Sequence, residues 1–124
     1  MISEGAVLRG IFESISTLQD QTNYTDEKGI NRTGELTIGQ LKVLIYLMRF
    51  KEASGVKISR DLGMAPPTVS RIIALLSTTV QTRKQAPLGY VTIEAVEGDR
   101  RNKIAKLTPK GKQLAGVIVG KFKD

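Results

Sequence analysis

Apolar residues return every three or four positions near the start of the chain, with polar residues between them. That period places them along one side of an α-helix, which we expect from about Ser3 to Asp20. An apolar stripe of this kind must pack against another surface. Its members are Val7, Leu8, Ile11, Phe12, Ile15 and Leu18.

A segment without periodicity separates this helix from the next. Residues 23–35 mix turn-forming residues with charges, and we expect a long loop there. A helix then begins at Thr37, because Thr37 and Gln40 have the spacing of a capping box. It is expected to end near Phe50 and to bury most of its apolar positions, which are Leu41, Leu44, Ile45, Leu47 and Met48.

The chain from Val56 to Leu76 has the pattern of a short strand and two helices. The strand is expected at Val56–Ile58, and Ser59 can cap a short helix that stops at Gly63. Met64–Pro66 then makes a tight connection into the second helix. We therefore predict a helix-turn-helix.

The second of these helices has Pro67 in its first turn and two contrasting faces. The face expected to be buried holds Val69, Ile72, Ile73 and Leu76. The opposite face holds Pro67, Ser70, Arg71 and Ala74. An ordinary surface helix would carry several lysines and glutamates there. A helix that enters a groove benefits instead from small residues and a few selected donors.

Alternation of apolar and polar residues marks Tyr90–Val96 as a half-buried strand. Residues 97–102, with the sequence EGDRRN, form the expected turn, and Lys103–Leu107 returns as the partner strand. The alternation of this partner is weaker, and the face that Ile104 takes stays open. Val91, Ile93 and Ala95 are expected on one side of the first strand, with Tyr90, Thr92 and Glu94 on the other.

A last helix follows the hairpin directly. Thr108 is its expected cap and Pro109 its first residue, a position that suits proline because no amide is needed there. Its apolar side consists of Leu114, Val117, Ile118 and Phe122.

Positive charge gathers in the second part of the chain. The 124 residues fit one compact domain with a net charge of +7. Residues 1–56 hold 6 basic and 7 acidic side chains, whereas residues 57–124 hold 13 and 5. A polyanion would be attracted to the second part, although a basic surface that only aids solubility explains the charge equally well.

Two residue types are missing from the whole sequence. Cysteine is absent, which excludes disulfides, thiolate zinc sites and thiol switches, and histidine is absent as well. The commonest metal ligands and general bases are thereby removed, so we expect no metal, no cofactor and no catalytic residues. No apolar run approaches the ~20 residues that cross a bilayer, and the first residues lack a signal-peptide pattern. We expect a cytoplasmic protein with no membrane partner.

Three stretches in this order resemble the MarR family of bacterial transcription regulators. ELTIGQLKVLIYL is similar to the family's second helix, and ISRDLGMAPPTVSRIIALL is similar to its helix-turn-helix. GDRRNKIAKLTPKG resembles its wing and is the most specific of the three. The wing positions that match are Asp99, Arg101, Leu107, Thr108 and Gly111.

The resemblance implies a fold that is mostly α with a small β-hairpin, a winged helix-turn-helix of α+β class. Residues 1–124 would form a single winged-helix domain, with the helix-turn-helix at 59–80 and the wing at 88–108. The terminal segments 1–22 and 109–123 would form the interface of a homodimer.

The resemblance also implies that the protein binds double-stranded DNA at a pseudo-palindromic site, most simply as a repressor. The recognition helix would lie in the major groove, and the wing arginine, Arg101, would enter the minor groove with Asp99 holding it. The DNA-binding residues implied or favoured in this way are Pro67, Thr68, Ser70, Arg71, Ala74, Asp99, Arg100, Arg101 and Lys103.

The sequence departs from the family pattern in two places. The segment between recognition helix and hairpin is several residues longer, which leaves the placement of the wing open. The chain also ends within one helix of about fifteen residues, where the family has two long ones, so a dimer interface would be reduced. Arg83 and Lys84 in the longer segment could touch phosphate or simply be solvated.

Several alternatives stay open from the sequence alone. The apolar stripes of the first and last helices could complete the core of one subunit, Arg71 could form a surface salt bridge, and the GDRRN turn could be merely solvated. A replication or partition factor of a mobile element could use the same fold on DNA, and a protein-interaction module could use it without DNA. A small-molecule effector is neither indicated nor excluded.

Overall fold

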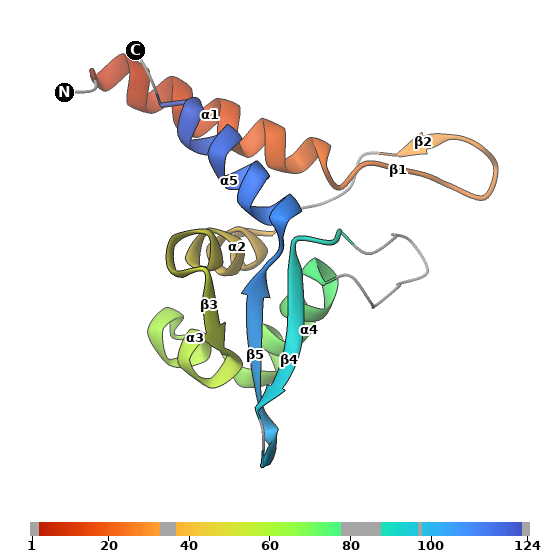
Figure 1. The fold of residues 1–124 in the computed structure, drawn as a ribbon. Coiled ribbons are helices and arrows are strands. Elements are labelled where there is room, and N and C mark those ends of the chain that lie inside the picture. The colour runs from red at the N-terminus through yellow and green to blue at the C-terminus, as the bar shows by residue number, and fades with distance from the viewer. Residues whose placement is uncertain (1–2, 33–36, 78–87, 97, 123–124) are drawn as a thin grey trace. The chain divides into compact units, whose positions relative to one another are not determined.

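The computed structural model describes residues 3–32, 37–77, 88–96 and 98–122. Within these residues it contains five helices, a three-stranded antiparallel sheet and a separate two-stranded hairpin (Figure 1). This is the α+β class that the sequence predicts. None of the described helices combines the length and apolarity that crossing a bilayer requires.

Contacts within the chain group it into two compact units. The terminal unit comprises Met1–Leu36 and Gln113–Asp124, and the central unit comprises Thr37–Lys112. The single domain expected from the length of the chain stays a prediction. Each unit has its own architecture.

Helix α1, Glu4–Asp20, begins the terminal unit where the sequence predicts it. The Ser3 hydroxyl accepts a hydrogen bond from the Ala6 amide at 3.1 Å and thereby caps the helix. Most of helix α5, Pro109–Gly120, belongs to the same unit.

The buried face of α1 consists of three small residues and Leu18, the one member of the apolar stripe that is buried. Gly10 lies against the ring of Phe122, just beyond the end of α5, so closely that a Cβ at Gly10 would lie 2.5 Å from a ring carbon. The stripe stays largely exposed, with Leu8 at 60% and Phe12 at 72% of their surface. Of the six residues of the stripe, only Leu18 is buried in this structure. The buried residues of α1 are Ala6, Gly10, Ser14 and Leu18.

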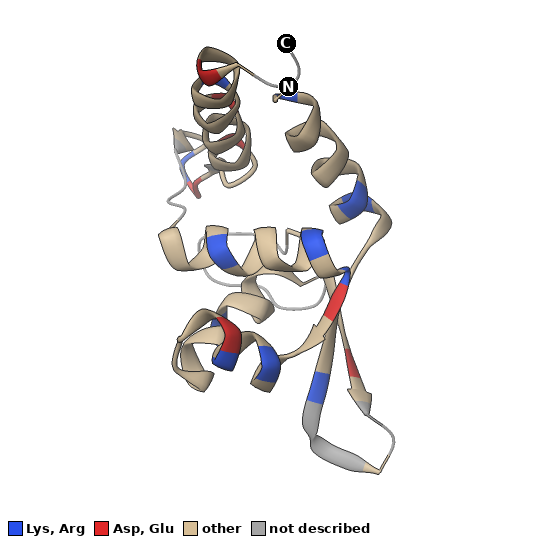
Figure 2. Cartoon of the chain, turned by 90° about the vertical axis from the view of Figure 1, so that its left-hand side faces the viewer, with Lys and Arg blue, Asp and Glu red and all other residues tan. Residues whose placement is uncertain are grey.

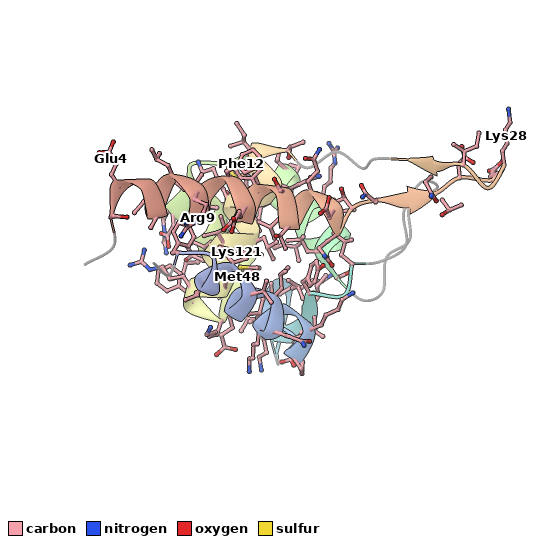
Figure 3. All side chains as sticks on the ribbon, turned by 90° about the horizontal axis from the view of Figure 1, so that it is seen from above. Glu4, Arg9, Phe12, Lys28, Met48 and Lys121 are labelled. Atoms are coloured by element: carbon pink, nitrogen blue, oxygen red, sulfur yellow. The ribbon has the colours of Figure 1, made fainter. Side chains whose placement is uncertain are left out.

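The long loop expected after α1 is wrong, because a short β-hairpin forms there. Strands β1, Tyr24–Thr25, and β2, Asn31–Arg32, pair in antiparallel register. The Asp26 carboxylate closes the turn by accepting hydrogen bonds from two backbone amides at 2.9 Å each. Gly29 has a φ of 78°, which glycine adopts without strain. Lys28 lies at the tip of this hairpin (Figure 3).

Helix α2, Ile38–Phe50, opens the central unit with the predicted capping box. The Gln40 amide donates to the Thr37 hydroxyl at 3.1 Å, and the Thr37 amide donates to the Gln40 side chain at 2.9 Å. Ile45 was expected to be buried but is 51% exposed, because Val43 and Tyr46 turn toward the core instead. The buried residues of α2 are Val43, Leu44, Tyr46, Leu47 and Met48.

The strand expected at Val56–Ile58 is wrong, and so is the cap at Ser59. Strand β3 is Glu52–Ser54, and helix α3, Gly55–Leu62, starts one residue later. Ser54 caps this helix by accepting a hydrogen bond from the Lys57 amide at 3.1 Å. The helix is thus about one turn longer than expected and includes Ser59 in its buried face.

Tyr46 links α2 to α3 through a polar contact. Its hydroxyl donates to the Asp61 carboxylate at 2.7 Å, and Lys57 donates to the same oxygen at 2.9 Å. The hydrogen bonds from Tyr46 and Lys57 lower the pKa of Asp61, whereas burial and the bond to Asp61 raise the pKa of Tyr46. The contact holds α3 in place ahead of the next helix.

This contact predicts a stability effect that depends on pH. Tyr46→Phe should lower the free energy of unfolding by about 1 kcal/mol near neutral pH, because the hydroxyl bond is lost. Since the folded pKa of Asp61 is lowered, its ionised form stabilises the fold above the unfolded value of about 3.9, and this contribution fades as the pH falls below that. Denaturant titrations at pH 7 and about pH 3 should show a smaller difference between Tyr46→Phe and the wild type at the lower pH. Lys57→Ala is the control, with a smaller effect because Lys57 is half exposed; an equal Tyr46→Phe deficit at both values would contradict the assignment.

Helix α4, Pro66–Leu76, packs against α2 and α3. Ser59 fixes the turn before it twice. Its carbonyl accepts from the Met64 amide at 3.0 Å, and its hydroxyl donates to the Met64 carbonyl at 2.5 Å. Gly63 ends α3 in the left-handed region at φ 64°, as the sequence predicts.

The sheet of the central unit has the order β3-β5-β4, with all neighbours antiparallel. Strand β4 is Val91–Val96 and strand β5 is Asp99–Leu107. Lys106 in the middle strand ties the three together, because its ammonium lies 3.0 Å from Glu94 on β4 and 3.7 Å from Glu52 on β3. Both carboxylates raise the pKa of Lys106.

The junction between β5 and α5 explains the stretch LTPKG. Thr108 caps α5 by accepting from the Gly111 amide at 3.1 Å, as predicted, and it donates to the Gly89 carbonyl at 2.7 Å. At Gly111 a Cβ would lie 2.5 Å from the Tyr90 carbonyl oxygen, so only glycine fits. The threonine and the glycine together fix the end of the hairpin to the start of the helix.

Candidate nucleic-acid interface

The outward face of α4 is the one that the helical period predicts. Ile72 and Ile73 are each 7% exposed, and Val69 and Leu76 are buried almost completely. On the opposite side Arg71 and its small neighbours are exposed, with Ala74 half-buried. Four of the DNA-binding residues predicted on this helix are exposed in the structure: Pro67, Thr68, Ser70 and Arg71.

Arg71 is the one charged side chain of α4. No described salt bridge involves Arg71, so the surface ion pair considered from the sequence finds no support among the described residues. An exposed guanidinium among small residues can approach another molecule closely.

Helix α4 starts at Pro66, which the sequence analysis placed in the connection before the helix. Ala65 is the cap and makes no side-chain hydrogen bond, while Pro66 and Pro67 are the first two helical residues. All three are exposed. The sequence prediction placed the start of the outward face at Pro67 and did not include Ala65 and Pro66, which are exposed as well. The adjacent prolines were the available signal, because proline is favoured at the first helical position.

The β4–β5 hairpin differs from its prediction at the turn end. Asp99, Arg100 and Arg101 were expected in a turn, but they form the beginning of β5 next to Gly98, whose φ is 81°. Their side chains lie outside the described part of the structure. Figure 1 shows the turn end of this hairpin extending beyond the helices of the central unit.

A register irregularity lies at the same place. Ala95 pairs with Lys103, whereas the next residue, Val96, pairs with Asp99. The three residues 100–102 therefore stand between consecutive pairs, which is a bulge in β5. Bulges increase the local twist and redirect side chains. The bulge places both arginines where the ladder is interrupted. Lys103, the remaining candidate on this strand, is exposed.

The two ends of the longer segment before the hairpin are held together by backbone hydrogen bonds. The Gly89 amide donates to the Ser77 carbonyl at 3.0 Å, and the Tyr90 amide donates to the Leu76 carbonyl at 2.9 Å. Ser77 also bridges to Val91. Residues 78–87, including Arg83 and Lys84, lie outside the described part of the structure, but the two ends of the segment meet.

The two units carry net charges of opposite sign. The central unit holds 14 basic and 5 acidic side chains, a net charge of +9. The terminal unit holds 5 basic and 7 acidic side chains, a net charge of −2. Figure 2 shows basic positions on the helices and the hairpin of the central unit. The whole excess of positive charge thus belongs to the unit that carries α4 and the hairpin, which suits a polyanionic partner.

No protein-family model matches the sequence, and no curated protein matches it closely. Solved structures with a similar backbone include reduced AbfR bound to DNA, a protein of Staphylococcus epidermidis. That comparison has a TM-score of 0.57 at 23% identity and covers 70% of this chain and 58% of the AbfR chain. MarR gives a TM-score of 0.55 at 19% identity, covering 69% of this chain and 56% of MarR.

A third structure matches nearly the full chain. NadR in complex with 4-hydroxyphenylacetate gives a TM-score of 0.60 at 15% identity, covering 95% of this chain and 68% of NadR. This chain thus spans little more than half the length of AbfR and MarR. At 23% identity and below, the likeness establishes the fold alone, and the winged helix-turn-helix of MarR is the fold that the sequence predicts.

Proposed function

We propose that the chain is a sequence-specific regulator of transcription that binds double-stranded DNA, with α4 in the major groove. The outward face of α4 carries this proposal. It offers one exposed arginine, Arg71, among small residues, in a unit with a net charge of +9. Arginine donates two hydrogen bonds to guanine in the major groove, and small neighbours let the helix approach the bases. The DNA in the AbfR structure supports the same class of partner.

The β4–β5 hairpin is proposed to lie at the adjoining minor groove. Arg101 would enter the groove, which is narrow and strongly negative over A·T runs, and Asp99 would hold its guanidinium in direction. Arg100 and Lys103 would contact phosphates. The bulge at 100–102 supports this arrangement, because it interrupts the ladder where these side chains begin.

The protein is proposed to act as a homodimer on a pseudo-palindromic site. The apolar stripe of α1 supports this, because Leu8 and Phe12, one helical turn apart, are both exposed; Figure 3 shows Phe12 on this helix. A two-fold dimer presents two recognition helices to two half-sites in inverted orientation. Binding over a promoter would exclude polymerase, so we propose a repressor.

Regulation by thiol oxidation is no part of the proposal. One AbfR structure contains a disulfide, whereas this chain has no cysteine. Neither a cofactor nor a metal is required for the proposed binding.

The salt dependence of binding tests the proposal. Each phosphate neutralised by a lysine or arginine releases a counterion, so log K should fall against log salt with a slope of about −0.9 per contact. For a basic dimer with several contacts we expect a steep slope in fluorescence anisotropy between low and moderate salt. A slope near zero would remove DNA as the partner.

A further inference from the structure

The first turn of α4 is unusual in having few backbone hydrogen-bond donors. Ala65, Pro66 and Pro67 are consecutive and all exposed. Prolines have no backbone N–H, so the first two helical positions offer no donor. Thr68 supplies the remaining amide of this turn. An Ala cap is tolerated here because the prolines leave little to be capped.

This composition argues against a phosphate at the start of the helix. Helix N-termini bind phosphate through several free amides and their side-chain caps. Here two of those amides are missing, and the cap residue has only a methyl group. The exposed surface of the first turn instead includes two pyrrolidine rings and the Ala65 methyl group beside Thr68.

The apolar surface continues along the outward face on both sides of the arginine. Pro67 precedes Arg71 by one helical turn, and Ala74 follows it by nearly one turn. Arg71 therefore stands between two small apolar groups on one face. In the major groove the apolar group on a base edge is the 5-methyl group of thymine, which pairs with alanine-like contacts.

We propose that α4 reads thymine methyl groups on either side of the base that Arg71 contacts. Pro67 meets one methyl and Ala74 another, so each half-site contains thymines within one or two base steps of an arginine-bound guanine. The inference rests on the proposed function and specifies the sequence class of its DNA. The net charge of +9 on the central unit favours DNA over a protein as the occupant of this face.

Uracil substitution tests the inference. A duplex is first selected by the wild-type protein from a random library, and each thymine of the half-sites is then replaced by deoxyuridine. This change keeps base pairing and removes the methyl group alone. Losing one buried methyl should weaken binding about fourfold at one or two positions in each half-site. Deoxyuridine outside the half-sites should change the affinity less than twofold.

Two variants separate a direct contact from an effect of uracil on DNA shape. Pro67→Ser and Ala74→Ser replace apolar groups by hydroxyls at an exposed and a half-buried position of α4. Each should abolish the thymine preference at its own position and keep it at the other. Equal affinity of the wild type for thymine and uracil duplexes, with specific binding intact, would overturn the inference and leave the proposed function standing. Failure to select or bind any duplex would overturn both.

Discussion

Replacing Arg71 by alanine is expected to weaken binding to the preferred duplex by about 1 to 3 kcal/mol for each half-site. Arg71 is exposed on the outward face of α4 and is the only charged group there. Its loss should also reduce discrimination, so the affinities for preferred and random duplexes should converge. Anisotropy titrations on both duplexes at one fixed salt concentration measure this directly.

Arg101→Ala is the charge-matched comparison for this variant. It removes the same charge from the same unit, but from the hairpin, where the minor groove offers little base information. Its affinity should fall on preferred and random duplexes alike, and most where A·T runs narrow the flanking groove. An equal loss on both duplexes for Arg71→Ala would contradict base reading by α4.

Phe12→Glu is expected to separate the proposed dimer and to weaken binding to a palindromic site on the order of 10²–10⁴-fold. Phe12 is 72% exposed within the apolar stripe of α1, so a carboxylate there should leave the folded chain intact and disrupt an apolar interface. Sedimentation velocity and titration of a full site against a half-site give the two readouts.

Ile38→Glu is the matched control for the dimer. Ile38 is 76% exposed at the start of α2, outside the stripe, so its substitution should change neither the sedimenting mass of the dimer nor its affinity for the palindromic duplex. A wild-type chain that sediments as a monomer at micromolar concentration, or a Phe12→Glu variant that stays dimeric, would contradict the proposed interface.

The parts of the fold that the sequence predicts correctly depend on local signals. The capping box at Thr37 and the cap at Thr108 involve residues three apart, and the two faces of α4 follow from the helical period alone. These signals are complete within one turn or one helix. The exposure of Pro67, Ser70 and Arg71 could therefore be predicted from the sequence, whereas the exposed Ala65 and Pro66 were not predicted and Ala74 is half-buried.

The parts that the sequence does not predict depend on residues far apart in the chain. Ser54 and Ser59 are equally good caps locally, and Ser54 is used because β3 pairs with β5 about fifty residues later. On α1 the buried face follows Gly10, which accommodates Phe122 from the other end of the chain. A count of apolar residues identifies the stripe but not this contact.

The candidate site shows the same division. The hairpin and its arginines are visible in the sequence, but the bulge at 100–102 arises from the register between β4 and β5. Likewise, the sequence shows the length of the segment before the hairpin. It does not show the backbone hydrogen bonds that join its ends, from Tyr90 to Leu76 and from Gly89 to Ser77.

Selection from a library of random duplexes, followed by sequencing, tests the central claim most directly. The account predicts enrichment of one pseudo-palindromic site by the wild-type protein, with two half-sites whose centres are about one helical turn apart, and loss of that enrichment with Arg71→Ala. Enrichment of direct repeats would indicate a replication or partition factor instead. No enrichment of any sequence by a folded wild-type protein at low salt would contradict the claim that this chain reads DNA through α4.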